Sequence, residues 1–108
     1  MPFDAFDIAL ALIRSLRRAL AKIAQHDKNL ADQIRRAATS AALNLCEGQC
    51  RKDRDQAHIW RIAHGSAQET LGGVRVAEAA GYVEPDDIAE SLSLADRLLA
   101  MCWRLTHR

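Results

Sequence analysis

The sequence predicts an all-α fold, an antiparallel up-down-up-down four-helix bundle. Only five Gly and two Pro occur among 108 residues, so helices have few interruptions. Apolar residues recur at helical spacing in four segments, and short polar breaks join these segments. Short connections make successive helices antiparallel neighbours. The length suits a single domain, residues 1–108, with one core.

The first predicted helix covers residues 4–25. Two sets of apolar residues repeat every seven positions, offset by three, which predicts the seam of a helix packed in a bundle. The sets are Phe6, Ile13 and Leu20, and Ala9, Leu16 and Ile23. The opposite side carries a basic row of Arg14, Arg17, Arg18 and Lys22. This row is a candidate for contact with nucleic-acid phosphates, and a solvated helix face is the alternative.

The second predicted helix, residues 29–49, carries a polar stripe beside its core stripe. The polar residues, spaced three or four apart, are Gln33, Arg36, Ser40, Asn44, Glu47 and Arg51. The core stripe on the other face comprises Leu30, Ile34, Ala37 or Ala38, Ala41 and Leu45.

The third predicted helix runs from residue 53 or 54 to 80. Its expected core residues are Trp60, Ala63, Ala67, Leu71 and Val74. Glycine is unfavourable inside helices, so Gly65, Gly72 and Gly73 predict a close helix contact, against the Ala-rich second helix.

Ser66 and Glu69 of the third helix can face the polar stripe of the second. Buried polar groups must be paired, so we expect Arg36 or Arg61 to join the glutamates. The predicted interhelical network consists of Arg36, Ser40, Asn44, Glu47, Ser66 and Glu69. The network is either a device that sets helix register or a binding site for a nucleotide or an RNA feature.

The fourth predicted helix begins at Glu84-Pro85-Asp86-Asp87 and runs to about residue 106. The first and fourth helices carry more apolar surface than one core requires. Because an exposed apolar face usually has a partner, we expect a homo-oligomer.

The charge distribution indicates a mild basic bias in the first part of the chain. Residues 1–61 hold 11 Lys+Arg against 7 Asp+Glu, a balance of +4, and residues 62–108 hold 4 against 7, a balance of −3. Arg51, Lys52 and Arg54 are further candidates for nucleic-acid contact. Salt bridges that cancel the asymmetry are the alternative, and no apolar run is long enough to predict a membrane span.

Three cysteines without framework spacing predict a reduced, cytoplasmic protein, and Asp4 and Asp7 argue against a signal peptide. Cys46 and Cys50, four residues apart, could place two thiolates on one face, but the chain has no second pair to complete a tetrahedral site. We expect both to be semi-buried and structural. Neither Glu47 nor Glu69 has His three residues on, and no nucleophile–base set appears, so we expect no metal, no cofactor and no enzyme activity.

These residues resemble those of a known family. The run 33–38 with Ser40, Asn44 and Glu47-Gly48, followed by Ile62-Ala63, Gly65-Ser66 and Glu69, is similar to the small "four helix bundle" proteins, the 23S rRNA-intervening sequence proteins. The resemblance implies a bacterial cytosolic four-helix bundle that assembles into a barrel-like homopentamer. Distant relatives are accessory proteins of diversity-generating retroelements, which bind a reverse transcriptase and nucleic acid.

The chain departs from the family pattern in two ways. Leu45-Cys46 stands where Ile-Ala is usual, and the chain is near neutral whereas the retroelement proteins are strongly basic. The resemblance therefore implies the fold more directly than a function. We expect a non-enzymatic oligomeric bundle that binds RNA or a nucleic-acid-processing protein, or a protein-interaction or assembly scaffold without nucleic-acid affinity.

Overall fold

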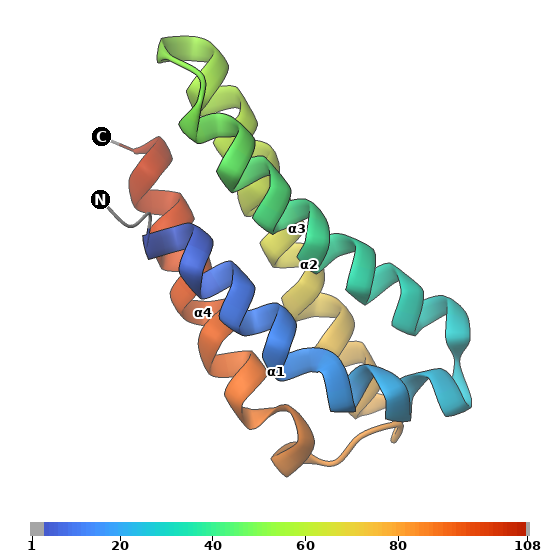
Figure 1. The fold of residues 1–108 in the computed structure, drawn as a ribbon. Coiled ribbons are helices and arrows are strands. Elements are labelled where there is room, and N and C mark those ends of the chain that lie inside the picture. The colour runs from blue at the N-terminus through green and yellow to red at the C-terminus, as the bar shows by residue number, and fades with distance from the viewer. Residues whose placement is uncertain (1–3, 108) are drawn as a thin grey trace.

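The computed structural model describes residues 4–107, which form four helices and no strand (Figure 1). The helices are α1 (Asp4–His26), α2 (Lys28–Gln49), α3 (Asp53–Ala79) and α4 (Pro85–Thr106). The predicted all-α class is therefore confirmed, and the helix ends lie within one or two residues of those expected. None of these helices combines the length and apolar character needed to cross a bilayer.

Local signals in the sequence explain where the helices begin and end. The Asp27 side chain caps α2 by accepting a hydrogen bond from the Leu30 backbone N–H at 2.9 Å. Glu84 and Asp87 form a reciprocal capping box at the start of α4, with Pro85 in the first turn. Gly81, at φ +82°, follows the end of α3, where a residue with a Cβ would be strained.

Each helix packs against two others, so the four surround one core. α2 contacts α1 and α3, and α4 contacts α3 and α1. Ile34 lies against Gly73, and Leu45 accepts a hydrogen bond from Trp60, so α2 and α3 run antiparallel. Ser15 meets Ser91 and Lys22 meets Asp87, so α1 and α4 are antiparallel too. In Figure 1 the α1–α4 pair lies beside the α2–α3 pair.

The core seam of α1 differs by one register position from the prediction. The predicted set Ala9, Leu16 and Ile23 is buried, but its companions are Ala5, Leu12 and Ala19. Phe6, Ile13 and Leu20 are half-buried and pack against the edge of the core. Small alanines at the centre of the seam let neighbouring helices approach, and the larger side chains fit better at its flank.

The core stripe of α3 contains Thr70 where the sequence predicted Leu71. Thr70 is fully buried, and its Oγ1 donates to the Ser66 carbonyl at 2.8 Å, which satisfies the hydroxyl within the helix. Leu71 is half-buried at the edge of the core. Trp60, Ala63, Ala67 and Val74 are buried as expected.

Two glycines allow α2 and α3 to approach closely. A Cβ at Gly73 would lie 2.6 Å from Cγ1 of Ile34, and one at Gly48 would lie 2.5 Å from Nε1 of Trp60. The expected close contact is thus confirmed for Gly73. It is wrong for Gly65 and Gly72, where an added Cβ would meet no atom within 4 Å.

The most exposed large apolar side chains do not lie where the sequence predicted. Within residues 4–107 they are Leu43 on α2, Ile62 and Val76 on α3, and Trp103 on α4, with exposed fractions of 63%, 41%, 56% and 51%. The large apolar residues of α1 are buried or half-buried against α2 and α4. The excess apolar surface expected on the first and fourth helices therefore lies mainly on α2 and α3.

Candidate functional site

Three residues of the predicted polar network meet between α2 and α3. The hydroxyl oxygens of Ser40 and Ser66 lie 2.8 Å apart, so one donates to the other. Asn44 Nδ2 donates to the Ser40 carbonyl at 2.8 Å and to Ser40 Oγ at 3.1 Å. All three side chains are half-buried. This cluster links the two helices at mid-length by hydrogen bonds between neutral groups.

The charged members of the predicted network do not join this cluster. Arg36 pairs with Asp32 of its own helix at 3.3 Å, and Arg51 pairs with Glu47 at 2.6 Å. Hydrogen bonds from Arg36, and then from Arg35, lower the pKa of Asp32. All of these groups reach solvent, so water and near neighbours satisfy them without a bridge between glutamates. The expected Arg36 or Arg61 bridge does not form.

Glu69 and Arg36 instead line an open hollow on the outer side of α2 and α3. The hollow has a volume of about 420 Å³, and its lining residues are Gln33, Arg36, Ala37, Ser40, Ser66 and Glu69. A second hollow of about 370 Å³ adjoins it, sharing Gln33 and Glu69, and extends to Leu30, Gly72 and Val76. Within residues 4–107, Glu69 has no ion pair.

These hollows define one surface, which we call the α2–α3 outer face. Ile62, Ser66, Glu69 and Val76 follow one another at steps of four, three and seven, so they share one side of α3. Leu43 is three residues beyond Ser40, so it lies on the same side of α2. We define the face by Gln33, Arg36, Ser40 and Leu43 of α2 and by Ile62, Ser66, Glu69, Gly72 and Val76 of α3.

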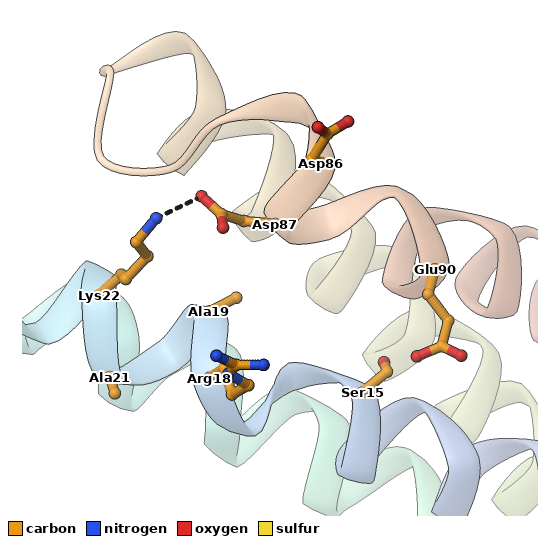
Figure 2. Close-up of a pocket in the computed structure, with 8 residues that line it drawn as sticks. All are labelled: Ser15, Arg18, Ala19, Ala21, Lys22, Asp86, Asp87 and Glu90. Atoms are coloured by element: carbon orange, nitrogen blue, oxygen red, sulfur yellow. Dashed lines mark hydrogen bonds and ion pairs between the residues drawn. The ribbon is translucent and has the colours of Figure 1, made fainter.

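The basic row of α1 lies beside acidic residues of α4. Figure 2 shows Arg18 and Lys22 on one side of a groove and Asp86, Asp87 and Glu90 on the other. The groove has a volume of about 570 Å³. Lys22 Nζ lies 2.8 Å from Asp87 Oδ2, and this hydrogen bond, with one from the Glu84 backbone, lowers the pKa of Asp87. The local field on this side of α1 is therefore mixed rather than basic.

The remaining basic candidates are exposed and fall into two places. Arg14 and Arg17 lie on α1 with Arg18, and within residues 4–107 none of the three has an ion pair. Arg51, Lys52 and Arg54 lie around the connection between α2 and α3. There Asp53 adopts a positive φ of 56°, which an aspartate tolerates better than most residues. The acidic Asp53 and Asp55 interrupt this second basic group.

Comparison with known proteins identifies the family. A model of the 23S rRNA-intervening sequence protein family matches residues 3–104. The chain belongs to this family. It is also similar to a crystal structure of a protein of unknown function from the S23 ribosomal protein family of Bacteroides thetaiotaomicron, with a TM-score of 0.86 and 17% identity over 96% of this chain and 99% of that one. At that identity the likeness shows the fold alone, and no curated protein matches the chain.

The cysteines of α2 differ from the prediction. Cys46 and Cys50 are exposed rather than semi-buried, because they lie on the side of α2 that no other helix covers. Cys102 is fully buried in α4, and burial raises the pKa of its thiol to about 11. Within residues 4–107 no three His, Cys, Asp or Glu side chains are grouped to hold a metal ion.

Two contacts between helices were not predicted from the sequence. Ser15 Oγ lies 2.8 Å from Oγ of the buried Ser91, and Trp60 Nε1 donates to the Leu45 carbonyl at 3.2 Å. Ser91 had a detectable signal, because it lies three residues after Ile88 and four before Ala95, inside the apolar stripe of α4. The partner of Trp60 is a backbone carbonyl, which no side-chain pattern reveals.

Proposed function

We propose that this protein is a non-enzymatic, up-down-up-down helical bundle of the bacterial cytoplasm that functions as a homo-oligomer. The α2–α3 outer face is the assembly surface. The observation that carries the proposal is the exposure of Ile62 and Val76 on the side of α3 that carries Ser66 and Glu69, together with the exposure of Leu43 on α2. Large apolar side chains grouped on one face of a small domain favour a partner.

Helical glycines support the same surface. Gly65 and Gly72 lie seven residues apart, near Ile62 and Val76, and each costs roughly 1 kcal/mol relative to Ala in a helix interior. No contact within residues 4–107 offsets this cost, since an added Cβ at either position would lie in open space. A helix of a second copy, packed closely against these glycines, would offset it.

The family resemblance implies five copies. A closed ring requires a heterologous contact, in which the outer face of one copy meets a different surface of the next. Trp103 lies on α4, outside the outer face, and is 51% exposed, so it is our candidate for the second surface. Light scattering of the purified protein tests the proposal, which expects five times the mass of one chain and is contradicted by a monomer at all concentrations.

A second candidate function, binding of RNA, is favoured by Arg14, Arg17 and Arg18. Within residues 4–107 these exposed arginines form no ion pair, whereas the neighbouring Lys22 pairs with Asp87, and Arg18 acts on Asp87 only through its charge. Arginine side chains that protein carboxylates leave unpaired can pair with phosphates. In a homo-oligomer the row would be repeated once in each copy, which multiplies weak contacts. The arginines of this second function lie on α1, outside the α2–α3 outer face.

A further inference from the structure

The exposed pair Cys46 and Cys50 is the group of metal-ligating side chains that neither candidate function uses. Both thiols lie at the end of α2 and reach solvent. Cys50 caps α2 with right-handed dihedral angles, φ −87° and ψ −3°, and its backbone N–H donates to the Glu47 carbonyl at 3.1 Å, so the chain still turns in the helical sense there and leaves the two cysteines about one turn apart. Two thiols one helical turn apart can therefore act together.

The spacing of the pair disfavours a disulfide. Residues four apart on a helix have Cβ atoms about 5–6 Å apart, whereas a disulfide needs about 3.5–4.5 Å. Closing that bond would distort the last turn of α2. An ion held between two sulfur atoms spans a longer distance, so the same spacing suits a bridging metal.

The surroundings determine which kind of ion fits. Glu47 lies between the two cysteines in sequence, but its carboxylate is engaged by Arg51 at 2.6 Å. No third His, Cys, Asp or Glu joins the pair within residues 4–107. A structural zinc site needs four ligands. Soft thiolate ligands select monovalent copper, which accepts two sulfur ligands.

We propose that Cys46 and Cys50 form a dithiolate site that binds one soft monovalent cation, of which Cu⁺ is the probe, per chain. The thiolate is the metal ligand, so binding releases two protons per ion when both thiols begin protonated. The site lies on the side of α2 that no helix covers, and an ion would enter directly from solvent. It requires neither self-assembly nor RNA binding.

An anaerobic titration of the reduced protein with Cu⁺, against a competing chelator of known affinity, tests the proposal. We expect one ion per chain in the wild type and at least tenfold weaker binding in Cys46→Ser and in Cys50→Ser. Cys102→Ala is the matched control and should bind as the wild type does, because Cys102 is buried away from this surface.

A second measurement does not depend on how the variants fold. Alkylation of the wild type, followed by mass spectrometry of its peptides, should show that Cu⁺ protects Cys46 and Cys50 together. Unchanged affinity in either serine variant would overturn the proposal. So would one ion per two chains, because four thiols from two copies would then be the ligands.

Discussion

Ser40 and Ser66 bring their hydroxyl oxygens within 2.8 Å of each other across the α2–α3 contact. This pair lies between two close approaches, Ile34 to Gly73 at one end and Trp60 to Gly48 at the other. Hydrogen bonds have directional requirements that apolar contacts lack, so the pair favours one register of the two helices. The close approaches at the two ends favour the same register, because each large side chain fits only where a glycine faces it.

Removing one hydroxyl of this pair should destabilise the fold modestly. We expect Ser66→Ala to lower the free energy of unfolding by about 1 kcal/mol, because the variant cannot make this half-buried hydrogen bond. Thr39→Ala is the control, since Thr39 is exposed and bonds only to a carbonyl of its own helix. Urea denaturation measures both. In a double-mutant cycle with Ser40→Ala, a coupling energy near zero would show that the pair does not link the helices.

The glycines of the α2–α3 pair should respond to alanine in opposite directions. Gly48→Ala would force a Cβ to within 2.5 Å of the Trp60 ring, so it should cost about 1–3 kcal/mol. Gly72→Ala adds a Cβ in open space and should stabilise the isolated chain by up to about 1 kcal/mol. Thermal unfolding of both variants checks the contrast. A stabilised Gly48→Ala would show that Trp60 does not restrict this position.

Gly72→Ala separates the stability of the fold from assembly. If a second copy packs closely on the α2–α3 outer face, the added methyl group should weaken assembly while the single chain becomes more stable. Sedimentation at several concentrations, compared with thermal unfolding of the same samples, measures both effects. A variant that is stabilised and assembles as tightly as the wild type would argue against close packing at Gly72.

The Lys22–Asp87 ion pair makes stability depend on pH. Its hydrogen bonds lower the pKa of Asp87 in the folded state, so its contribution is fully present above the pKa of the unfolded chain, about 4 for an aspartate. The contribution disappears as the pH falls further, through the lower folded value. Asp87→Asn keeps an oxygen that can accept the Glu84 backbone hydrogen bond but removes the charge.

Asp87→Asn should therefore be less stable than the wild type at pH 7, and the two should converge as the pH falls below about 4. Urea denaturation at a series of pH values measures the difference. Asp96→Asn, at an exposed position of α4 without an ion pair in residues 4–107, should have the smaller effect at pH 7. A difference for Asp87→Asn that persists unchanged in acid would contradict the assignment.

The helices were predictable from sequence because their signals are local. Asp27, Gly81 and the Glu84-Pro85 start each act within one turn of a helix end. The contacts between helices were less predictable, because they depend on how far each helix is rotated. On α1, a difference of one register position put Ala5 rather than Phe6 in the core, and on α3 the rotation of the helix leaves Gly65 and Gly72 without a close neighbour.

The candidate network was predictable in its neutral members and not in its charged ones. Ser40, Asn44 and Ser66 have short side chains whose reach is fixed by the backbone, so their spacing determines their partners. Arg36 and Glu47 have long, exposed side chains. Each forms an ion pair about one turn away, Arg36 with Asp32 and Glu47 with Arg51. An exposed ion pair between two helices would add little to the stability of the fold.

RNA binding should depend on Arg14, Arg17 and Arg18 of α1, which form no ion pair within residues 4–107. Replacing Arg14, Arg17 and Arg18 together by Gln should weaken binding of a structured RNA and reduce the slope of log affinity against log salt. The expected reduction is about 0.7–0.9 for each phosphate that the variant no longer neutralises. The matched control, which also loses three charges, replaces Arg75, Arg97 and Arg104 by Gln at exposed positions of α3 and α4. A gel-shift series in salt makes the measurement, and no shift at low salt would exclude this function.

Assembly through the α2–α3 outer face is most directly tested by sedimentation equilibrium of Val76→Glu. Val76 is 56% exposed in the single chain, so a glutamate there should leave the helices intact, as circular dichroism can verify. Buried in an interface, the same charge would lack a partner and oppose association. Ala89→Glu, at an exposed position of α4, is the control. We predict that the wild type and the control form one homo-oligomer while Val76→Glu sediments as single chains. A Val76→Glu protein that assembles like the wild type would contradict assembly through this face.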